Sequence, residues 1–270
     1  MTAEVPARAV PGMRGPDAER RRDGARSSLV WDVLAQVIAE RAASTGRAAL
    51  DIVDVGAGTG GFAVGLASRG HRVTVVDPSP DALTAARWRA AEAGVALTDV
   101  QGEATDLPAL VGEPDAGGAG ADLVICHSVL EYVDSPPAAL AAVARVLRPG
   151  GTVSVLAANS VAAVLQRALA GKYAEARALL PGRPVPPDGA AAPEAGPAGR
   201  RFTLPELTAL IEEAGLRPGD AHGIRVFASL LPGAGADTAA AEALRELEAA
   251  AASCPPLRDI AARLHVLGHR

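Results

Sequence analysis

The chain has 270 residues, of which 49% are hydrophobic and only 3% aromatic, so it is long enough for one sizeable domain with a core built mainly from Ala, Val and Leu. Its 26 basic and 31 acidic residues give a formal net charge of -5, which argues against a protein that coats nucleic acid non-specifically. The two cysteines, Cys126 and Cys254, belong to no CxxC or Cys/His cluster, so the sequence predicts no metal site.

The N-terminal residues 1–25 alternate proline, glycine, arginine and acids, and we expect them to form a mobile arm. They lack the apolar core of a signal peptide, and no apolar run of the chain is long enough to span a bilayer. We therefore expect a cytoplasmic protein without a membrane partner. Ser28 can cap a helix that runs to about Ala43.

Short apolar runs then alternate with helical patterns. Such alternation predicts a parallel sheet covered by helices on both faces. The expected strands are 50–55, 71–76, 96–100, 121–127 and 151–157, and the expected helices between them are 60–69, 80–93 and 136–147.

The C-terminal part contains a segment rich in proline and glycine at 181–200, which reads as a low-complexity linker or a lid loop. The elements expected after it are a helix at 203–214, a strand at 216–230, a helix at 239–252 and a strand at 264–267. We expect residues 26–270 to form a single domain.

A glycine-rich turn, Asp54 to Gly61, follows the first strand and opens a helix. Glycine lets a ligand lie almost on the backbone, so a nucleotide-like cofactor is the first hypothesis. Gly56, Gly58 and Gly61 fit the G-x-G-x-x-G pattern of NAD(P)-dependent oxidoreductases, which alone is a weak signal. Gly60 adds a third closely spaced glycine. The negative charge of Asp54 is unfavourable beside a pyrophosphate, but it suits a cofactor with a cationic amine or a loop that needs bracing.

Asp77 ends the second expected strand. Its carboxylate is placed to accept hydrogen bonds from both hydroxyls of a ribose. The alternative is a loop carboxylate that braces Ser79 or a helix N-terminus. We favour the ribose role because of the neighbouring glycine turn.

These motifs resemble those of class I S-adenosylmethionine-dependent methyltransferases over about residues 50–160. The resemblance rests on Asp-x-Gly-x-Gly-x-Gly at 54–60, Val75-Val76-Asp77-Pro78-Ser79 and Leu147-Arg148-Pro149-Gly150-Gly151. It implies a Rossmann-like α/β fold: a seven-stranded, mostly parallel sheet with a reversed last strand and helices on both faces. The segments 216–230 and 264–267 would supply the final pair of strands.

Further segments are similar to the bacterial tRNA 5-carboxymethoxyuridine methyltransferases, which convert the oxyacetic acid of a wobble uridine to its methyl ester. The similar segments are Cys126 to Pro136, Arg26 before Trp31, Asn159-Ser160 opening a helix, Ala170-Gly171-Lys172-Tyr173, 211–215, 223–227, 242–248 and His265-Val266. The resemblance implies S-adenosylmethionine as cofactor and tRNA as partner.

The resemblance also implies roles for individual residues. Arg26 would bind the carboxylate of the cofactor, although a surface arginine is the alternative. His127 would close the pocket at the end of the fourth strand, although a strand-end histidine is as often structural. The remaining implied cofactor contacts are Asp54, Gly56, Ala57 and Gly58 in the turn, Asp77 and Pro78 at the ribose, and Ala104, Thr105 and Asp106 at the adenine.

The chemistry of the acceptor decides which side chains catalysis needs. A carboxylate is already ionised, so methyl transfer to it reduces to proximity, orientation and desolvation. A cation is then needed to hold the acid; Arg225 is the candidate, with a surface arginine as the alternative. A hydroxyl acceptor would instead need a base, such as His127 or Glu131.

One departure from the tRNA-modifying relatives concerns positive charge. Those enzymes carry a lysine-rich patch where this chain has 181–200, and the chain offers Arg177, Arg183, Arg200 and Arg201 instead. A small-molecule O- or N-methyltransferase of secondary metabolism is therefore the second hypothesis. An NAD(P)-dependent oxidoreductase and a non-catalytic cofactor-binding fold are more distant alternatives. The oligomeric state stays open.

Overall fold

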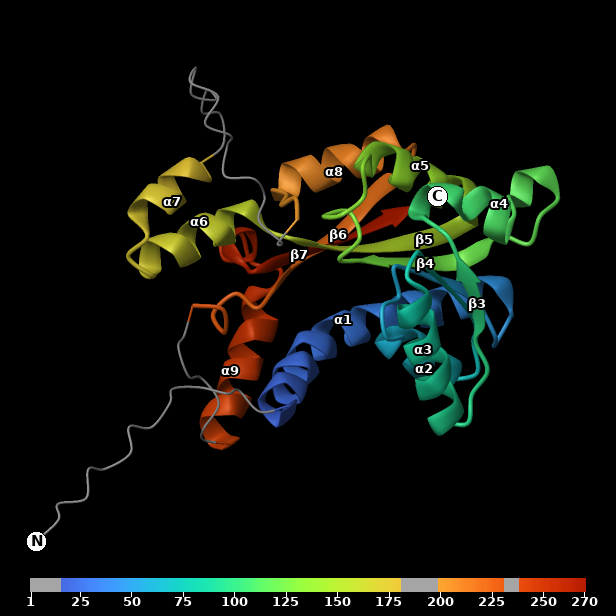
Figure 1. The fold of residues 1–270 in the computed structure, drawn as a ribbon, viewed down its shortest axis with the longest axis horizontal. Coiled ribbons are helices and arrows are strands. Elements are labelled where there is room, and N and C mark those ends of the chain that lie inside the picture. The colour runs from blue at the N-terminus through green and yellow to red at the C-terminus, as the bar shows by residue number, and fades with distance from the viewer. Residues whose placement is uncertain (1–15, 181–198, 231–237) are drawn as a thin grey trace, which may run out of the picture.

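The computed structural model describes residues 16–180, 199–230 and 238–270, and for residues 16–28 and 238–239 it describes the backbone only. Its centre is a seven-stranded sheet in the order β3-β2-β1-β4-β5-β7-β6 (Figure 1). β7 runs antiparallel to both of its neighbours, and the remaining pairs are parallel, which confirms the predicted Rossmann-like sheet with a reversed strand. The strands are β1 (Asp51–Val55), β2 (Arg72–Asp77), β3 (Thr98–Gln101), β4 (Ala121–His127), β5 (Leu147–Ala158), β6 (Arg217–Ile224) and β7 (Arg263–His269).

Helices cover both faces of the sheet, as predicted. One face carries α1 (Pro16–Thr45), α2 (Gly61–Ala67) and α3 (Pro80–Glu92), and the other carries α4 (Leu107–Val111), α5 (Pro136–Val146) and α8 (Leu204–Glu213) (Figure 1). The other elements are α6 (Ser160–Leu169), α7 (Tyr173–Ala178), α9 (Thr238–Ala251) and the 3-10 helices η1 (Ala104–Asp106), η2 (Pro114–Ala116) and η3 (Arg258–Ile260).

Alternation of side chains along the strands decides what each face carries. In β4, Ile125 packs with the core under α1, α2 and α3, whereas Val124 and Cys126 pack with the core under α5 and α8. By the same parity, Asp54, Asp77 and His127 belong to the first face, and each lies at the carboxyl end of its strand or within one residue of it. In open α/β sheets ligands bind outside the carboxyl ends of the strands, so three predicted site residues share one edge and one face.

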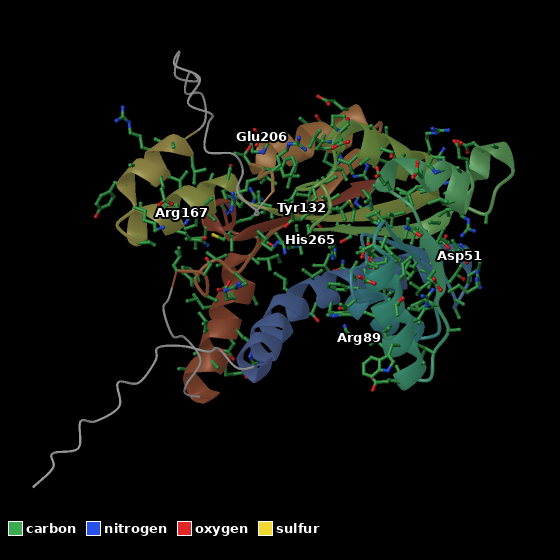
Figure 2. All side chains as sticks on the ribbon, in the orientation of Figure 1. Asp51, Arg89, Tyr132, Arg167, Glu206 and His265 are labelled. Carbon is green, nitrogen blue, oxygen red and sulfur yellow. The ribbon has the colours of Figure 1, made fainter. Side chains whose placement is uncertain are left out.

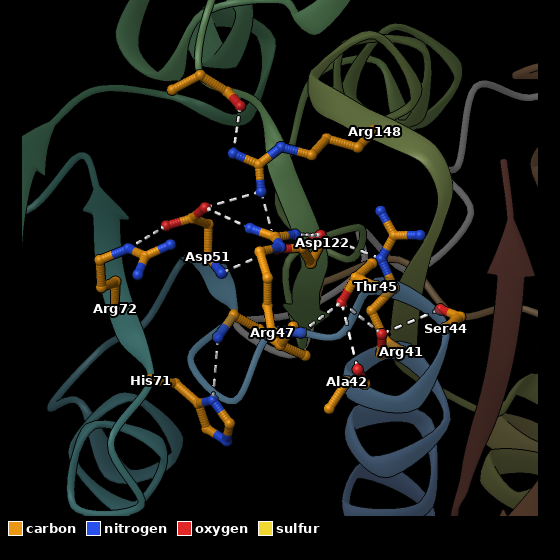
Figure 3. A network of polar contacts seen from close by, with 12 residues as sticks. Arg41, Ala42, Ser44, Thr45, Arg47, Asp51, His71, Arg72, Asp122 and Arg148 are labelled. Atoms are coloured by element: carbon orange, nitrogen blue, oxygen red, sulfur yellow. Dashed lines mark hydrogen bonds and ion pairs between the residues drawn. The ribbon is translucent and has the colours of Figure 1, made fainter.

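The opposite edge of the sheet is closed by an ion network around Asp122, whose side chain is fully buried (Figure 3). Its carboxylate accepts hydrogen bonds from Arg41 Nε at 3.0 Å, Arg148 NH1 at 2.8 Å and the N–H of Asp51 at 3.0 Å, and it also contacts Arg47. Arg148 also pairs with Asp51 at 2.7 Å. The network therefore ties α1 and the starts of β1, β4 and β5 together, away from the candidate ligand edge.

Several element boundaries differ from the sequence prediction. α1 begins at Pro16 rather than Ser28, because residues 16–27 are helix-forming but carry no apolar stripe that would reveal them. The backbone of residues 16–25, expected to be a mobile arm, is therefore helical. β6 lies within the expected range 216–230 and ends at Ile224, because Arg225 has a left-handed φ of 62° that breaks the strand. Of the expected loop 181–200, residues 181–198 lie outside the described part.

Candidate functional site

The glycine turn has the tight geometry that its sequence predicts. Gly56, Gly58 and Gly60 have φ values of 62°, 52° and 75°, in the region that favours glycine. A Cβ on Gly56 would lie 2.6 Å from Cγ2 of Val129, and one on Gly60 would lie 2.9 Å from Cβ of Ala86. A Cβ on Gly58 would meet nothing within 4 Å. The turn is thus packed closely at Gly56 and Gly60 and open at Gly58, where a ligand can approach the backbone.

Asp77 ties this turn to the end of β2. Its Oδ2 accepts the N–H of Gly58 at 2.9 Å, and its Oδ1 accepts the N–H of Ser79 at 2.9 Å. The bracing of Ser79 that the sequence left as an alternative is therefore present. The Asp77 carboxylate still has acceptor capacity, because each oxygen can accept a further hydrogen bond from a ribose hydroxyl. Pro78 and the N-cap Ser79 lead directly into α3.

Asp54 lies beneath the turn, 4% exposed. Burial raises its pKa to about 7, the N–H of Ala63 lowers it, and the nearby charge of Asp77 raises it. Ala63 is in the first turn of α2, whose N-cap Gly60 has no side chain to accept a hydrogen bond. Asp54 thus supplies the acceptor that a capping side chain normally provides.

Residues 102–106 follow β3 at the same edge of the sheet. The N–H of Gly102 donates to the carbonyl of Asp77 at 3.3 Å, and η1 begins two residues later. Ala104 is buried, and Asp106 accepts the N–H of Glu103 at 3.1 Å in a capping box. The three residues expected at the adenine thus follow directly after the contact between Gly102 and Asp77, and the Asp106 carboxylate already has a structural partner.

His127 belongs to a row of polar side chains that runs across β4, β5, β7 and β6 and consists of His127, Ser154, His265 and His222. Its Nε2 lies 2.7 Å from Oγ of Ser154, which lies 2.7 Å from Nε2 of His265. His265 in turn stacks on His222, with ring centroids 5.6 Å apart (Figure 2 labels His265). Burial, and then the neighbouring His265 and Arg263, hold the pKa of His127 well below its usual range, so the imidazole is neutral.

The described part of α1 lies against α2 above this row. Trp31 packs against Phe62 with ring centroids 5.0 Å apart, and Phe62 meets His127 edge-on at 4.9 Å. The side chain of Arg26, five residues before Trp31 in the sequence, lies outside the described side chains. α1 is thus positioned beside the glycine turn, and the role of Arg26 stays a prediction.

A pocket of about 260 Å³ lies at the carboxyl end of β5, between α6 and the start of β7. Arg201, Arg225 and Arg263 line it together with Asn159. The carboxylate of Glu131, which is 5% exposed, accepts hydrogen bonds from Arg263 NH2 at 3.0 Å and from the N–H of Ala158 at 2.9 Å.

The backbone around Arg225 is anchored by α9. Glu248 accepts the N–H groups of Val226, Phe227 and Ala228 at 2.7, 2.9 and 2.6 Å. The carbonyl of Arg225 accepts the N–H of Ala262 at 3.1 Å. These bonds hold Arg225 in its left-handed conformation next to the pocket.

Comparison with known proteins decides the family. A methyltransferase domain family model matches residues 53–155, which include the glycine turn and Asp77. The tRNA 5-carboxymethoxyuridine methyltransferase of Escherichia coli (strain K12) is 28% identical over 250 residues, 91% of this chain and 88% of that protein. The chain is a class I S-adenosylmethionine-dependent methyltransferase.

Other relatives of this methyltransferase share its fold or part of its sequence. The ubiquinone biosynthesis O-methyltransferase of Xylella fastidiosa (strain 9a5c) is 31% identical over 175 residues, 64% of this chain and 63% of that protein. The crystal structure of magnesium protoporphyrin IX methyltransferase from Synechocystis PCC 6803 with bound SAH matches with a TM-score of 0.56 and 14% identity, covering 97% of this chain and 90% of that chain. The oxidoreductase alternative left open by the glycine pattern is therefore wrong.

The residues present fit S-adenosylmethionine, which is the cofactor of this methyltransferase. The turn is open where a cofactor backbone contact is needed, at Gly58, and the Asp77 carboxylate beside it suits a ribose. Within the described residues no group of three His, Cys, Asp or Glu side chains could hold a metal ion. No helix in the same part of the chain is both long enough and apolar enough to cross a bilayer.

The structure brings together most of the predicted residues and adds others. Asp54, Asp77 and His127 share the α1 face, and Arg225 lies at the neighbouring pocket. Ser154, His265 and Arg263 were not predicted as site residues. Their roles depend on which strands become neighbours, so the sequence carries no local signal for Ser154 and Arg263, and His265 stood out only within the similar segment His265-Val266.

Proposed function

We propose that this methyltransferase esterifies a carboxylate, and that the acceptor is 5-carboxymethoxyuridine at the wobble position of tRNA. The observation that carries the proposal is the pocket lined by Arg201, Arg225 and Arg263. Guanidinium groups bind carboxylates through paired, charge-assisted hydrogen bonds, so this lining favours an anionic acceptor. The relative from Escherichia coli, which aligns over 91% of this chain, supports tRNA as its carrier.

The cofactor roles in this proposal follow the sequence prediction. Gly56, Ala57 and Gly58 line the amino-acid part of the cofactor, and Asp77 with Pro78 binds the ribose. Ala104, Thr105 and Asp106 flank the adenine, and Arg26 binds the carboxylate. Asp54 braces the turn from below and faces the cationic part of the cofactor.

The bound cofactor supplies a methyl group on a positively charged sulfur. An acceptor that is already an ionised carboxylate would need no proton transfer to take up this methyl group. The protein then has to hold the acid, align it and keep water away. Arg225 holds the acid, and the neutral His127 forms part of the wall.

The titratable side chains near the pocket favour a carboxylate over a hydroxyl. His127 has a low pKa, and its Nε2 is engaged by Ser154. The carboxylate of Glu131 is paired with Arg263 at 3.0 Å. Within the described residues, Nδ1 of His127 and Oε2 of Glu131 have no hydrogen-bond partner, but the low pKa of His127 makes its imidazole a weak general base for a hydroxyl acceptor.

A small-molecule O-methyltransferase is the second candidate, favoured by the ubiquinone biosynthesis relatives, of which the one from Xylella fastidiosa is 31% identical over 64% of this chain. Mass spectrometry of tRNA nucleosides from a deletion strain separates the two. We expect the wobble methyl ester to disappear and its free acid to accumulate. An unchanged profile, in an organism that makes the modification, refutes the tRNA proposal.

An assay with the purified enzyme tests the type of bond formed. Methyl groups transferred from labelled S-adenosylmethionine to acid-bearing tRNA should be released by mild alkali, because esters hydrolyse there and ethers and N-methyl groups do not. Arg225→Ala should lower acceptor turnover far more than cofactor binding. Equal losses in both would contradict the role of Arg225.

A further inference from the structure

Two adjoining recesses meet at Arg201. The first is the pocket of about 260 Å³ that Arg225 and Arg263 also line. The second, of about 190 Å³, is lined by Arg167 of α6 (Figure 2) and by Lys172. Arg201, Ala163 and Gln166 belong to both linings, so a ligand larger than a single acid group can extend from one recess into the other past Arg201.

Acidic side chains pair with most of the cations around these recesses. Arg263 is paired with Glu131 at 3.0 Å. Arg167 and Lys172 lie 3.4 and 3.1 Å from Glu175. In contrast, the guanidinium of Arg201 forms no hydrogen bond or ion pair within the described part of the chain. Its positive charge is thus available for a ligand.

The backbone on both sides of Arg201 is held in place. The N–H of Arg200 donates to the carbonyl of Glu131 at 2.8 Å, and the N–H of Phe202 donates to the carbonyl of Ala158 at 2.9 Å. The carbonyl of Phe202 accepts the N–H of Ser160 at 3.0 Å, and the Phe202 side chain is only 4% exposed. Because the backbone is already ordered, only the rotamers of the Arg201 side chain have to be fixed when a ligand binds, which lowers the entropic cost of recognition.

We propose that Arg201, which lines the same pocket as Arg225, supplies a second contact to the negative charge of the acceptor acid and distinguishes the acid from its methyl ester. The inference rests on the proposed function. Esterification removes the negative charge that a guanidinium binds. Arg201 would therefore retain the substrate and release the product.

The direct test measures binding of an anticodon stem-loop RNA that carries the wobble uridine as the 5-oxyacetic acid or as its methyl ester, with SAH present to prevent turnover. We expect the wild type to bind the acid about tenfold more tightly than the ester, in line with one charge-assisted contact. Arg201→Ala should lose most of this preference. Arg201→Lys should keep part of the preference.

Arg200→Ala is the matched control. It removes the same charge one residue away, but the Arg200 guanidinium donates to the carbonyl of Val133 at 3.2 Å and lines neither recess. We expect this variant to retain the preference for the acid. If Arg201→Ala also retains it, or if Arg200→Ala loses it to the same extent, the inference is wrong while the proposed function stands.

A second titration separates failure of the inference from failure of the proposed function. A wild type that methylates no acid-bearing stem-loop contradicts the tRNA function. Calorimetry then measures the binding of inorganic phosphate to the SAH complex, which tests the anion site without RNA. Binding to the wild type and to Arg200→Ala, and its loss in Arg201→Ala, supports Arg201 as an anion anchor. Absence of binding to the wild type overturns it.

Discussion

Replacing Asp54 by asparagine should stabilise this protein at alkaline pH. Asp54 is 4% exposed and forms no ion pair within the described residues, so ionising it in the folded state is unfavourable. Burial is the main cause that raises its pKa from the ordinary value of 3.8 to about 7, and the charge of Asp77 adds to it. Asparagine keeps the shape and an oxygen that can accept the N–H of Ala63.

The size of the effect follows from the pKa. One pKa unit corresponds to about 1.4 kcal/mol, so a rise from 3.8 to about 7 destabilises the ionised folded protein by about 4 kcal/mol at most. Between these two pH values the folded protein binds more protons than the unfolded chain, so the contribution of Asp54 to stability falls as pH rises and is constant above about pH 7. We expect Asp54→Asn to gain about 1–4 kcal/mol at pH 8.5, and less as the pH falls toward 4.

Urea unfolding of both proteins at several pH values between 4 and 8.5 measures this difference directly. The control is Asp134→Asn, which alters an exposed aspartate and should change stability by less than about 0.5 kcal/mol. An Asp54→Asn protein that is less stable than the wild type at pH 8.5 would refute the reasoning. Such a result would mean that the carboxylate is stabilised in place as an anion.

The further predictions concern other buried groups. Asp122→Asn should lower the free energy of unfolding by about 2–4 kcal/mol in urea, because it leaves the partly buried guanidinium groups around it without their shared partner. Asp77→Ala should weaken S-adenosylmethionine binding at least about thirtyfold by calorimetry, since bonds of a charged group to the turn and the ribose are lost; unchanged affinity would contradict its ribose role. His127 and His265 should stay neutral between pH 5 and 8 in nitrogen NMR, because burial, together with the neighbouring His222, lowers the pKa of His265 to about 3 and burial lowers that of His127. They should also carry opposite tautomers, since the Ser154 hydroxyl has one proton to share between two Nε2 atoms. Ser154→Ala should remove that correlation, and identical tautomers in the wild type would show that the hydrogen-bonded row is misassigned.

Asp122 and Asp54 show why burial alone does not predict the effect of a charge. Burial raises the pKa of Asp122, but the N–H of Asp51, the guanidinium of Arg41 and the charges of Arg148 and Arg47 together outweigh it, so the net pKa is lowered. That carboxylate stabilises the fold above its unfolded pKa, and the contribution is lost as pH falls through its folded pKa. Asp54 has no such cations within the described residues, and its contribution has the opposite sign.

The sequence by itself determined the parts of this protein that depend on short-range patterns. The alternation of apolar runs and helices located the strands up to β5 along the chain, and the turn from Asp54 to Gly61 indicated the edge of the sheet at which Asp77 also lies. Asp77 could be recognised from its place at the end of a strand. These features follow from backbone periodicity and from glycine conformation, which neighbouring residues control.

Only the tertiary structure decided which distant side chains meet. Arg263 begins β7, and because β7 runs antiparallel to β5, its first residue lies opposite Ala158 at the carboxyl end of β5. Arg201 comes to the same pocket because Phe202 pairs with Asn159. Strand neighbours and register are set by packing of the whole sheet, so the arginine-lined pocket could not be predicted from local spacing as the glycine turn could.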